Sequence, residues 1–142
     1  MGPLMEETGW TAPHELFHAF AAEPFALLLD SATAGPLRAP ALHGRWSFIA
    51  LDPFETLIAR DGLVDGAPPF EALKARLAAF ALPPDKTAGL PPFCGGAAGF
   101  FGYELARTLE RLPPPRAPFA PDGRSPPDMA LGLYDTVLAF DM

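Results

Sequence analysis

Three stretches of this 142-residue sequence carry residues whose types and spacing could do chemistry. The first is "GGAAGFFGY", residues 95–103, because glycines ahead of a helix often cradle phosphate. These glycines match neither the G-x-G-x-x-G spacing of a dinucleotide site nor a P-loop, and no lysine follows them. We therefore interpret the stretch as a strand whose small residues let another layer approach its backbone closely.

The second stretch is "HELFH", which matches the H-E-x-x-H pattern of zinc peptidases. On a helix, His14 and His18 share one face, and Glu15 could act as general base toward a metal-bound water. A catalytic zinc needs a third protein ligand, however, and Pro13 places His14 in the first helical turn. The remaining histidine, His43, lies in a proline- and glycine-rich loop. A small zinc peptidase is therefore the less favoured alternative to an ordinary amphipathic helix.

The third stretch combines "LLLDSA" with "HGRWSF" about a dozen residues later. A carboxylate and a hydroxyl at a strand end, Asp30 and Ser31, can hold an ammonium group, and Arg45 can hold a carboxylate. Trp46 can form the wall of an apolar slot, so the set would suit an amino acid. The alternative is structural: Asp30 and Ser31 cap a turn, and Arg45 pairs with Asp52 or another surface acid.

The elements that must position these residues follow from apolar periodicity and turn signals. The pattern predicts helices over 12–22, 69–81 and 103–112, and strands over 24–30, 45–51, 55–61 (followed closely by "LVDG") and 129–140. Turn signals at Asp52-Pro53 and Asp61-Gly62 predict hairpins between the middle strands. Helices without regular β-α alternation favour an α+β fold, with a mainly antiparallel sheet and about three helices.

Composition excludes several classes of protein. A net charge of −7 argues against nucleic acid as a partner, since polyanion binders need clustered Lys and Arg. The single cysteine, Cys94, cannot form an internal disulfide, and the N-terminus lacks a secretory pattern. No apolar run approaches the roughly 20 residues that span a bilayer. These features predict a cytoplasmic protein that is not inserted in a membrane.

Four motifs then occur in a recognisable order: "LLLDSA", "GRWSFIALDPFE", "GGAAGFFGYELARTLERLP" and "PDMALGLYDTVLAFD". From about Phe25 to Asp141 they resemble the N-terminal region of component I of aminodeoxychorismate synthase, whose sister family is anthranilate synthase component I. The resemblance implies that residues 1–142 form one domain, an incomplete layer of the family's α/β sandwich. Because the strand predicted over 129–140 ends two residues before the sequence does, we expect the chain to be the front part of a larger protein.

The resemblance also implies a reaction. In the family, the whole enzyme aminates chorismate to 4-amino-4-deoxychorismate for para-aminobenzoate and folate synthesis, with ammonia delivered by a glutamine amidotransferase. The catalytic base, the chorismate contacts and the carboxylates that bind Mg²⁺ lie in a C-terminal chorismate-binding domain. No catalytic or metal-binding residue is therefore assigned to this chain, and we expect it to be inactive alone. Anthranilate synthase, in tryptophan synthesis, is the alternative.

The family's N-terminal region contributes half of a tryptophan pocket and part of the face that meets the amidotransferase. By resemblance, the half pocket consists of Leu29, Asp30, Ser31, His43, Gly44, Arg45 and Trp46. Since the other wall of the pocket belongs to the C-terminal domain, we expect weak or no tryptophan binding by this chain alone. Apolar surfaces that the domain would cover also allow a homodimer.

Overall fold

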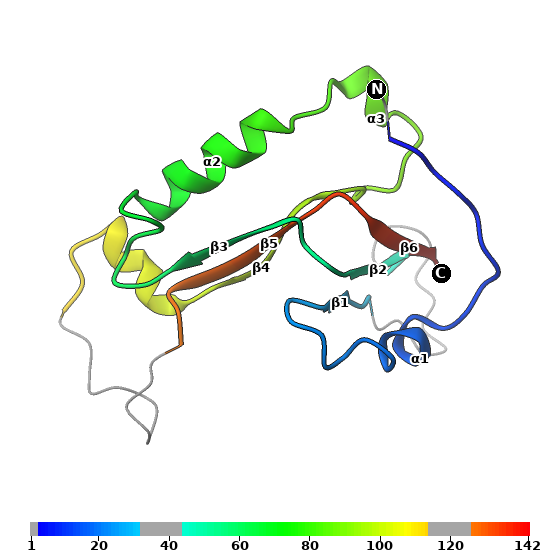
Figure 1. Ribbon diagram of the computed structural model, residues 1–142, viewed down its shortest axis with the longest axis horizontal. Coiled ribbons are helices and arrows are strands. Elements are labelled where there is room, and N and C mark those ends of the chain that lie inside the picture. Colours follow the sequence, from blue (N-terminus) through cyan, green and yellow to red (C-terminus); the bar gives the residue numbers. More distant parts are fainter. Residues whose placement is uncertain (1–2, 32–43, 114–125) are drawn as a thin grey trace.

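The computed structural model describes residues 3–31, 44–113 and 126–142, and in this part of the chain the fold is α+β (Figure 1). The elements are α1 (Pro13–Phe17), β1 (Leu27–Leu29), β2 (Trp46–Ala50), β3 (Glu55–Ala59), α2 (Pro69–Ala79), α3 (Pro84–Thr87), β4 (Gly96–Phe101), the 3₁₀ helix η1 (Tyr103–Thr108), β5 (Met129–Tyr134) and β6 (Val137–Asp141). The strands form two antiparallel sheets, ordered β1-β2-β6 (the β2 sheet) and β3-β5-β4 (the β5 sheet). The predicted fold class, with its mainly antiparallel pairing, is confirmed.

The core lies between α2 and one face of the β5 sheet, along which the helix runs in Figure 1. Its buried members are Leu57, Ala59, Val64, Leu105, Met129, Leu131 and Leu133, with Ala72 and Leu73 of α2 packed against them. Alternate residues of β5 face this core, as the two-residue period of a strand requires. The helix begins at a proline, whose fixed φ suits the first helical position and whose missing N–H is not needed there.

Gly99 in β4 explains part of the small-residue stretch. A Cβ at this position would lie 2.1 Å from the Ala130 carbonyl oxygen and 2.9 Å from the Leu131 Cα, and its φ is +152°. The close approach therefore comes from the neighbouring strand β5 in the same sheet. This corrects the interpretation that another layer requires the small residue at this position.

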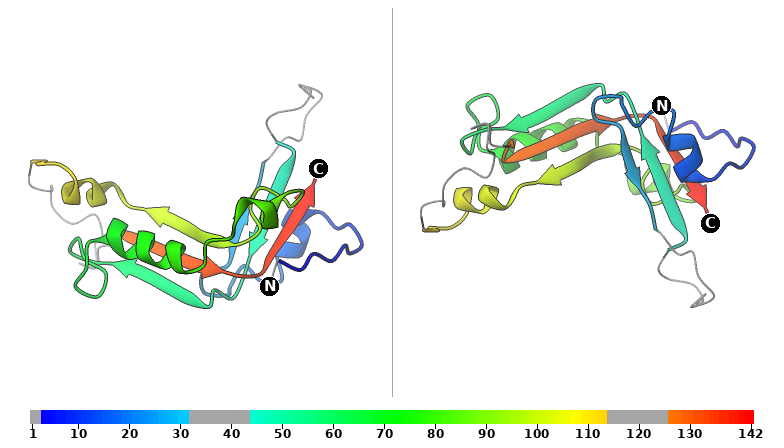
Figure 2. Two further views of the ribbon diagram at one scale, coloured as in Figure 1. Left: turned by 90° about the horizontal axis from the view of Figure 1, so that it is seen from above. Right: turned by 90° about the horizontal axis from the view of Figure 1, so that it is seen from below.

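The strand predicted over 129–140 is two strands in different sheets. β5 is the centre of one sheet and β6 an edge of the other, and Figure 2 shows the chain bending between them. The break falls at Asp135 and Thr136, where the Thr136 hydroxyl donates to the Asp135 carboxylate. At this junction the Tyr134 hydroxyl donates to the Phe25 carbonyl at 2.6 Å, which ties the end of β5 to the segment before β1.

The hairpin predicted around Asp52-Pro53 is wrong, because β2 and β3 also belong to different sheets. Asp52 has a φ of +48° and Pro53 cannot donate a ladder bond, so these residues carry the chain from one sheet to the other. The turn at Asp61-Gly62 is confirmed, since Arg60 and Leu63 pair across it.

Two predicted helices are shorter or tighter than expected, whereas the one over 69–81 is confirmed by α2. α1 stops at Phe17, and the next bonds, such as Ala19 N–H to the Leu16 carbonyl, span three residues as in 3₁₀ turns. The segment predicted over 103–112 is the 3₁₀ helix η1, and α3 was not predicted. No helix among the described residues is long and apolar enough to cross a bilayer.

Candidate functional site

Five of the predicted site residues meet at one end of the β2 sheet. Leu29 ends β1 and pairs in register with a residue of β2, and Asp30 and Ser31 follow it directly. Trp46 begins β2, and Arg45 precedes it. Because β1 and β2 are antiparallel neighbours, the end of one strand lies beside the start of the other. Gly44 leads into β2 with a φ of +93°, whereas His43 lies outside the described residues.

Ser47 connects the two segments. Its hydroxyl donates to Asp30 Oδ1 at 2.9 Å and accepts from the Ser31 N–H at 3.1 Å. The Ser31 hydroxyl in turn donates to the Trp46 carbonyl. Ser47 is fully buried, yet it is not among the residues that the sequence predicts. The available signal was its place in "WSF", where a lone hydroxyl alternates with two aromatic side chains along a strand.

Arg45 is held by an acid from the far end of the chain. Its Nε and Nη2 donate to the two carboxylate oxygens of Asp141 at 2.7 and 2.6 Å, and its guanidinium lies 5.0 Å from the centre of the Trp46 ring. This hydrogen bonding lowers the pKa of Asp141 and raises the pKa of Arg45. The structural alternative named another surface acid besides Asp52 as the partner of Arg45, and that acid is Asp141. Both side chains are solvent-exposed, so the pair adds little to stability.

The candidate residues present their groups on two faces of β2. Side chains alternate along a strand, so Trp46 and Phe48 lie on one face and Ser47 on the other. The bond from Ser47 therefore places the Asp30 carboxylate on the opposite side of β2 from the Trp46 ring. The Trp46 ring stacks on Phe48 with centroids 6.2 Å apart. One face of β2 thus carries the Asp30 carboxylate, and the other carries the Trp46 ring with the Arg45 guanidinium beside it.

The second candidate is the zinc pattern, and the described part of the chain does not bring enough ligands together to complete it. His14 and Glu15 belong to the five-residue helix α1, and His18 is its C-terminal cap. Among residues 3–31, 44–113 and 126–142, no three His, Cys, Asp or Glu side chains lie close enough together to hold a metal ion. The remaining candidate ligand, His43, is outside those ranges.

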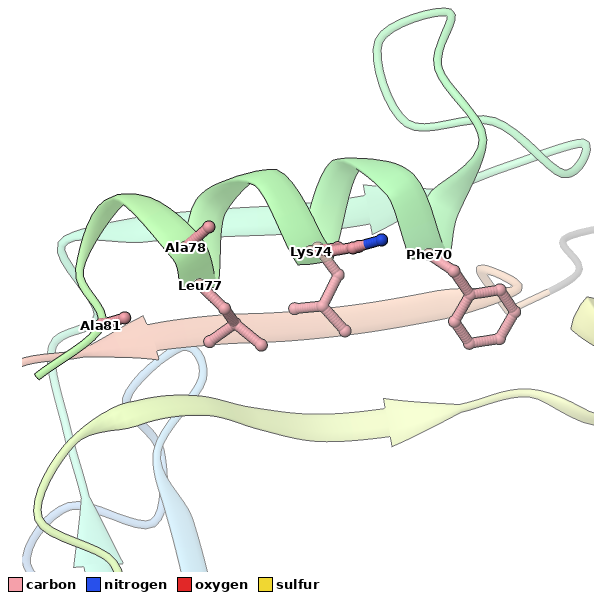
Figure 3. Close-up of a pocket in the computed structure, with 6 residues that line it drawn as sticks. Phe70, Lys74, Leu77, Ala78 and Ala81 are labelled. Carbon is pink, nitrogen blue, oxygen red and sulfur yellow. The ribbon is translucent and has the colours of Figure 1, made fainter. Parts of the chain in front are cut away.

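An apolar groove lies elsewhere, along α2 (Figure 3). It has a volume of about 430 Å³ and is lined by Phe70, Leu73, Lys74, Leu77, Ala78 and Ala81. Phe70 and Leu77 reach from the helix toward the sheet, and Phe70 stacks on Phe101 of β4. This groove is separate from the β2 sheet that carries the predicted ligand residues.

Comparison with known proteins supports the resemblance. The chain is 36% identical to anthranilate synthase component 1 of Mycolicibacterium smegmatis, over 83% of this chain and 22% of the relative. It is 32% identical to aminodeoxychorismate synthase component 1 of Klebsiella aerogenes, over 99% of this chain and 32% of the relative. With the same component of Salmonella typhimurium it shares 35% identity, over 83% and 26% of the two chains. No protein-family model matches the chain.

The chain is therefore similar to component 1 proteins of two enzymes, aminodeoxychorismate synthase and anthranilate synthase. The chain spans between 22% and 32% of the length of these three relatives.

Proposed function

We propose that this chain is the non-catalytic N-terminal region of component I of aminodeoxychorismate synthase and works in the cytoplasm. The whole enzyme would aminate chorismate to 4-amino-4-deoxychorismate for para-aminobenzoate and folate synthesis. The supporting observation is the pattern of coverage, since 83–99% of this chain aligns with only 22–32% of each relative. The rest of the relatives' length leaves room for a chorismate-binding domain that carries Mg²⁺ and the catalytic groups.

The exposed face of the β5 sheet supports a role as a structural layer. Ile58, Ala130 and Phe100 stand in one row across its three strands, on the face opposite α2. Ile58 is 41% exposed and Phe100 46% exposed. Exposed apolar rows of this kind are typical of surfaces that another protein layer covers. We assign this face to the chain's own chorismate-binding domain, with the amidotransferase subunit as a further partner.

We also propose that the β2 sheet supplies half of a tryptophan pocket. Its residues would be Leu29, Asp30, Ser31, His43, Gly44, Arg45 and Trp46. The placement of Asp30 beside Ser31 at the end of β1, both held by Ser47, supports the assignment of the ammonium-binding part of this pocket. The second half of the pocket would come from the chorismate-binding domain.

Reconstitution tests the proposal. The chain is co-expressed with the part of the Klebsiella aerogenes relative that it does not match, and the purified pair is supplied with chorismate, ammonia and Mg²⁺. We expect 4-amino-4-deoxychorismate from the pair and none from the chain alone. Phe100→Glu should block activation because it places a charge in the exposed apolar row. Leu109→Glu is the matched control, since Leu109 is 69% exposed and lies outside that row. Chorismate turnover by the chain alone would contradict the proposal.

Anthranilate synthase component I remains the second candidate for a specific reason. The chain is 49% identical to the chloroplastic anthranilate synthase alpha subunit 1 of Arabidopsis thaliana, although over only 34% of this chain. The same reconstitution, repeated with the remainder of the Mycolicibacterium smegmatis relative, separates the two candidates by product. Anthranilate from that pair, with no activation of the Klebsiella aerogenes partner, would favour the second candidate.

A further inference from the structure

We infer that Ser47 is the positioning residue of the candidate ligand site, and that it holds the Asp30 carboxylate and the Ser31 backbone where a ligand ammonium would meet them. The ligand part of this inference rests on the proposed tryptophan pocket. The positioning part rests on contacts in the chain itself.

The first support is the complete use of a buried hydroxyl. Ser47 is fully buried, and a buried hydroxyl is costly unless it forms hydrogen bonds. The Ser47 hydroxyl oxygen accepts a hydrogen bond from the Ser31 N–H. The hydroxyl also has one proton of its own to donate. Its proton therefore points to Asp30 Oδ1, which is an acceptor when ionised. The direction of both bonds is thus fixed by the groups present.

The second support is the end of the strand ladder. The pairing of β1 with β2 stops at Leu29, so backbone ladder bonds do not hold the next two residues. Asp30 and Ser31 are instead tied by the Ser47 hydroxyl and by the Trp46 carbonyl, which accepts from the Ser31 hydroxyl. Ser47, on the neighbouring strand, therefore contacts both residues beyond the ladder, through the carboxylate of Asp30 and the backbone N–H of Ser31.

The third support is the accessibility of the acid. Asp30 remains exposed although one of its oxygens accepts from Ser47. An ionised carboxylate offers roughly four lone-pair sites, so it can accept from Ser47 and from a ligand at the same time. A primary ammonium, as in an amino acid, is the group that an exposed and oriented carboxylate binds well.

Three variants separate positioning from general stability. Ser47→Ala removes the hydroxyl, Ser47→Thr retains it, and Asp30→Asn keeps a carbonyl acceptor while it removes the charge. Amide hydrogen exchange of Ser31, followed by NMR, is the ligand-free measurement. Ser47→Ala should speed this exchange by about tenfold or more because the amide loses its acceptor. Asp30→Asn and Ser47→Thr should leave it protected, and the β5 amides should stay protected in all three variants.

The second measurement is an NMR titration with L-tryptophan at millimolar concentration. Ser47→Ala and Asp30→Asn should each weaken binding by about tenfold, and Ser47→Thr should restore it. Unchanged Ser31 exchange in Ser47→Ala would overturn the inference, as would faster exchange throughout both sheets. If neither the wild-type chain nor the reconstituted pair binds tryptophan, the proposed pocket fails. Faster exchange confined to Ser31 in Ser47→Ala would still support the positioning of Asp30 and Ser31.

Discussion

Replacing Gly99 by alanine tests the packing of the β5 sheet most directly. The new Cβ would lie 2.1 Å from the Ala130 carbonyl oxygen, well inside the 3.4 Å at which ordinary contact begins. The Leu131 Cα, at 2.9 Å, closes the same space. Both obstructing atoms belong to the backbone of the central strand, so no side chain can rotate away. The variant must therefore separate β4 from β5 locally.

The expected cost has two parts. A non-glycine residue at a φ of +152° carries backbone strain of about 1–3 kcal/mol. Separating the strands also weakens ladder hydrogen bonds, each with a net contribution of about 1 kcal/mol. Together these effects predict a loss of about 3 kcal/mol or more in the free energy of unfolding. That is a large part of the roughly 5–15 kcal/mol that stabilises a typical domain.

Urea unfolding followed by circular dichroism measures this loss. With a slope of about 1–3 kcal/mol per molar urea, the midpoint should fall by roughly 1–3 M. Gly66→Ala is the matched control, because Gly66 has a φ of +83° but nothing within 4 Å of the place that the alanine methyl carbon would take. The control should lose only the strain of a positive φ, about 1–2 kcal/mol. A Gly99→Ala chain within about 0.5 kcal/mol of the wild type would refute the close approach of the two strands.

Three further changes have defined outcomes. Tyr134→Phe removes a buried hydroxyl's bond to a backbone carbonyl and should cost about 1 kcal/mol in urea unfolding. Burial raises the pKa of Tyr134 above its ordinary 10.0. The neutral phenol therefore contributes to the free energy of unfolding below pH 10.0, and this contribution is lost as the pH rises through the folded pKa. The phenylalanine variant should accordingly lose less stability than the wild type at alkaline pH. Arg45→Met should raise the pKa of Asp141 toward 3.8, as followed by the NMR shift of its carboxyl carbon, because the arginine that lowers it is gone. Leu131→Ala should cost about 2–5 kcal/mol because this side chain is buried in the core, whereas Leu109→Ala, at a position 69% exposed, should change unfolding by less than about 0.5 kcal/mol.

Helices and strands of this fold could be predicted where the spacing of apolar residues was enough to define the element. α2 carries its apolar residues at helical spacing and begins at a proline, and the structure agrees within a turn of the predicted range. The pairing of strands could not be predicted in the same way. Nothing in the alternation of residues 129–140 reveals that the chain leaves one sheet at Asp135 and enters another. That choice depends on partners far away in the sequence, which a local pattern does not contain.

The candidate site shows the same division. The chemistry of Asp30, Ser31, Arg45 and Trp46 could be predicted from residue types, and the structure brings them to one end of a sheet. Their division between two faces of β2 could not be predicted, because it depends on the register of β1 against β2. The same is true of the partner of Arg45, since Asp141 reaches it only through the pairing of β6 with β2.

That pairing of β6 also governs the order of events during synthesis. β2 and β6 are far apart in the sequence, and β6 supplies one whole side of the β2 sheet. While the ribosome is still translating β5, the segments of β1 and β2 can form only a short two-stranded ribbon, which is marginal in water. Their third strand arrives after residues 137–141 have left the exit tunnel. Until then the backbone N–H and C=O groups along that edge of β2 lack their ladder partners, so the newly made N-terminal half presents an unpaired strand edge that chaperones or other chains can bind.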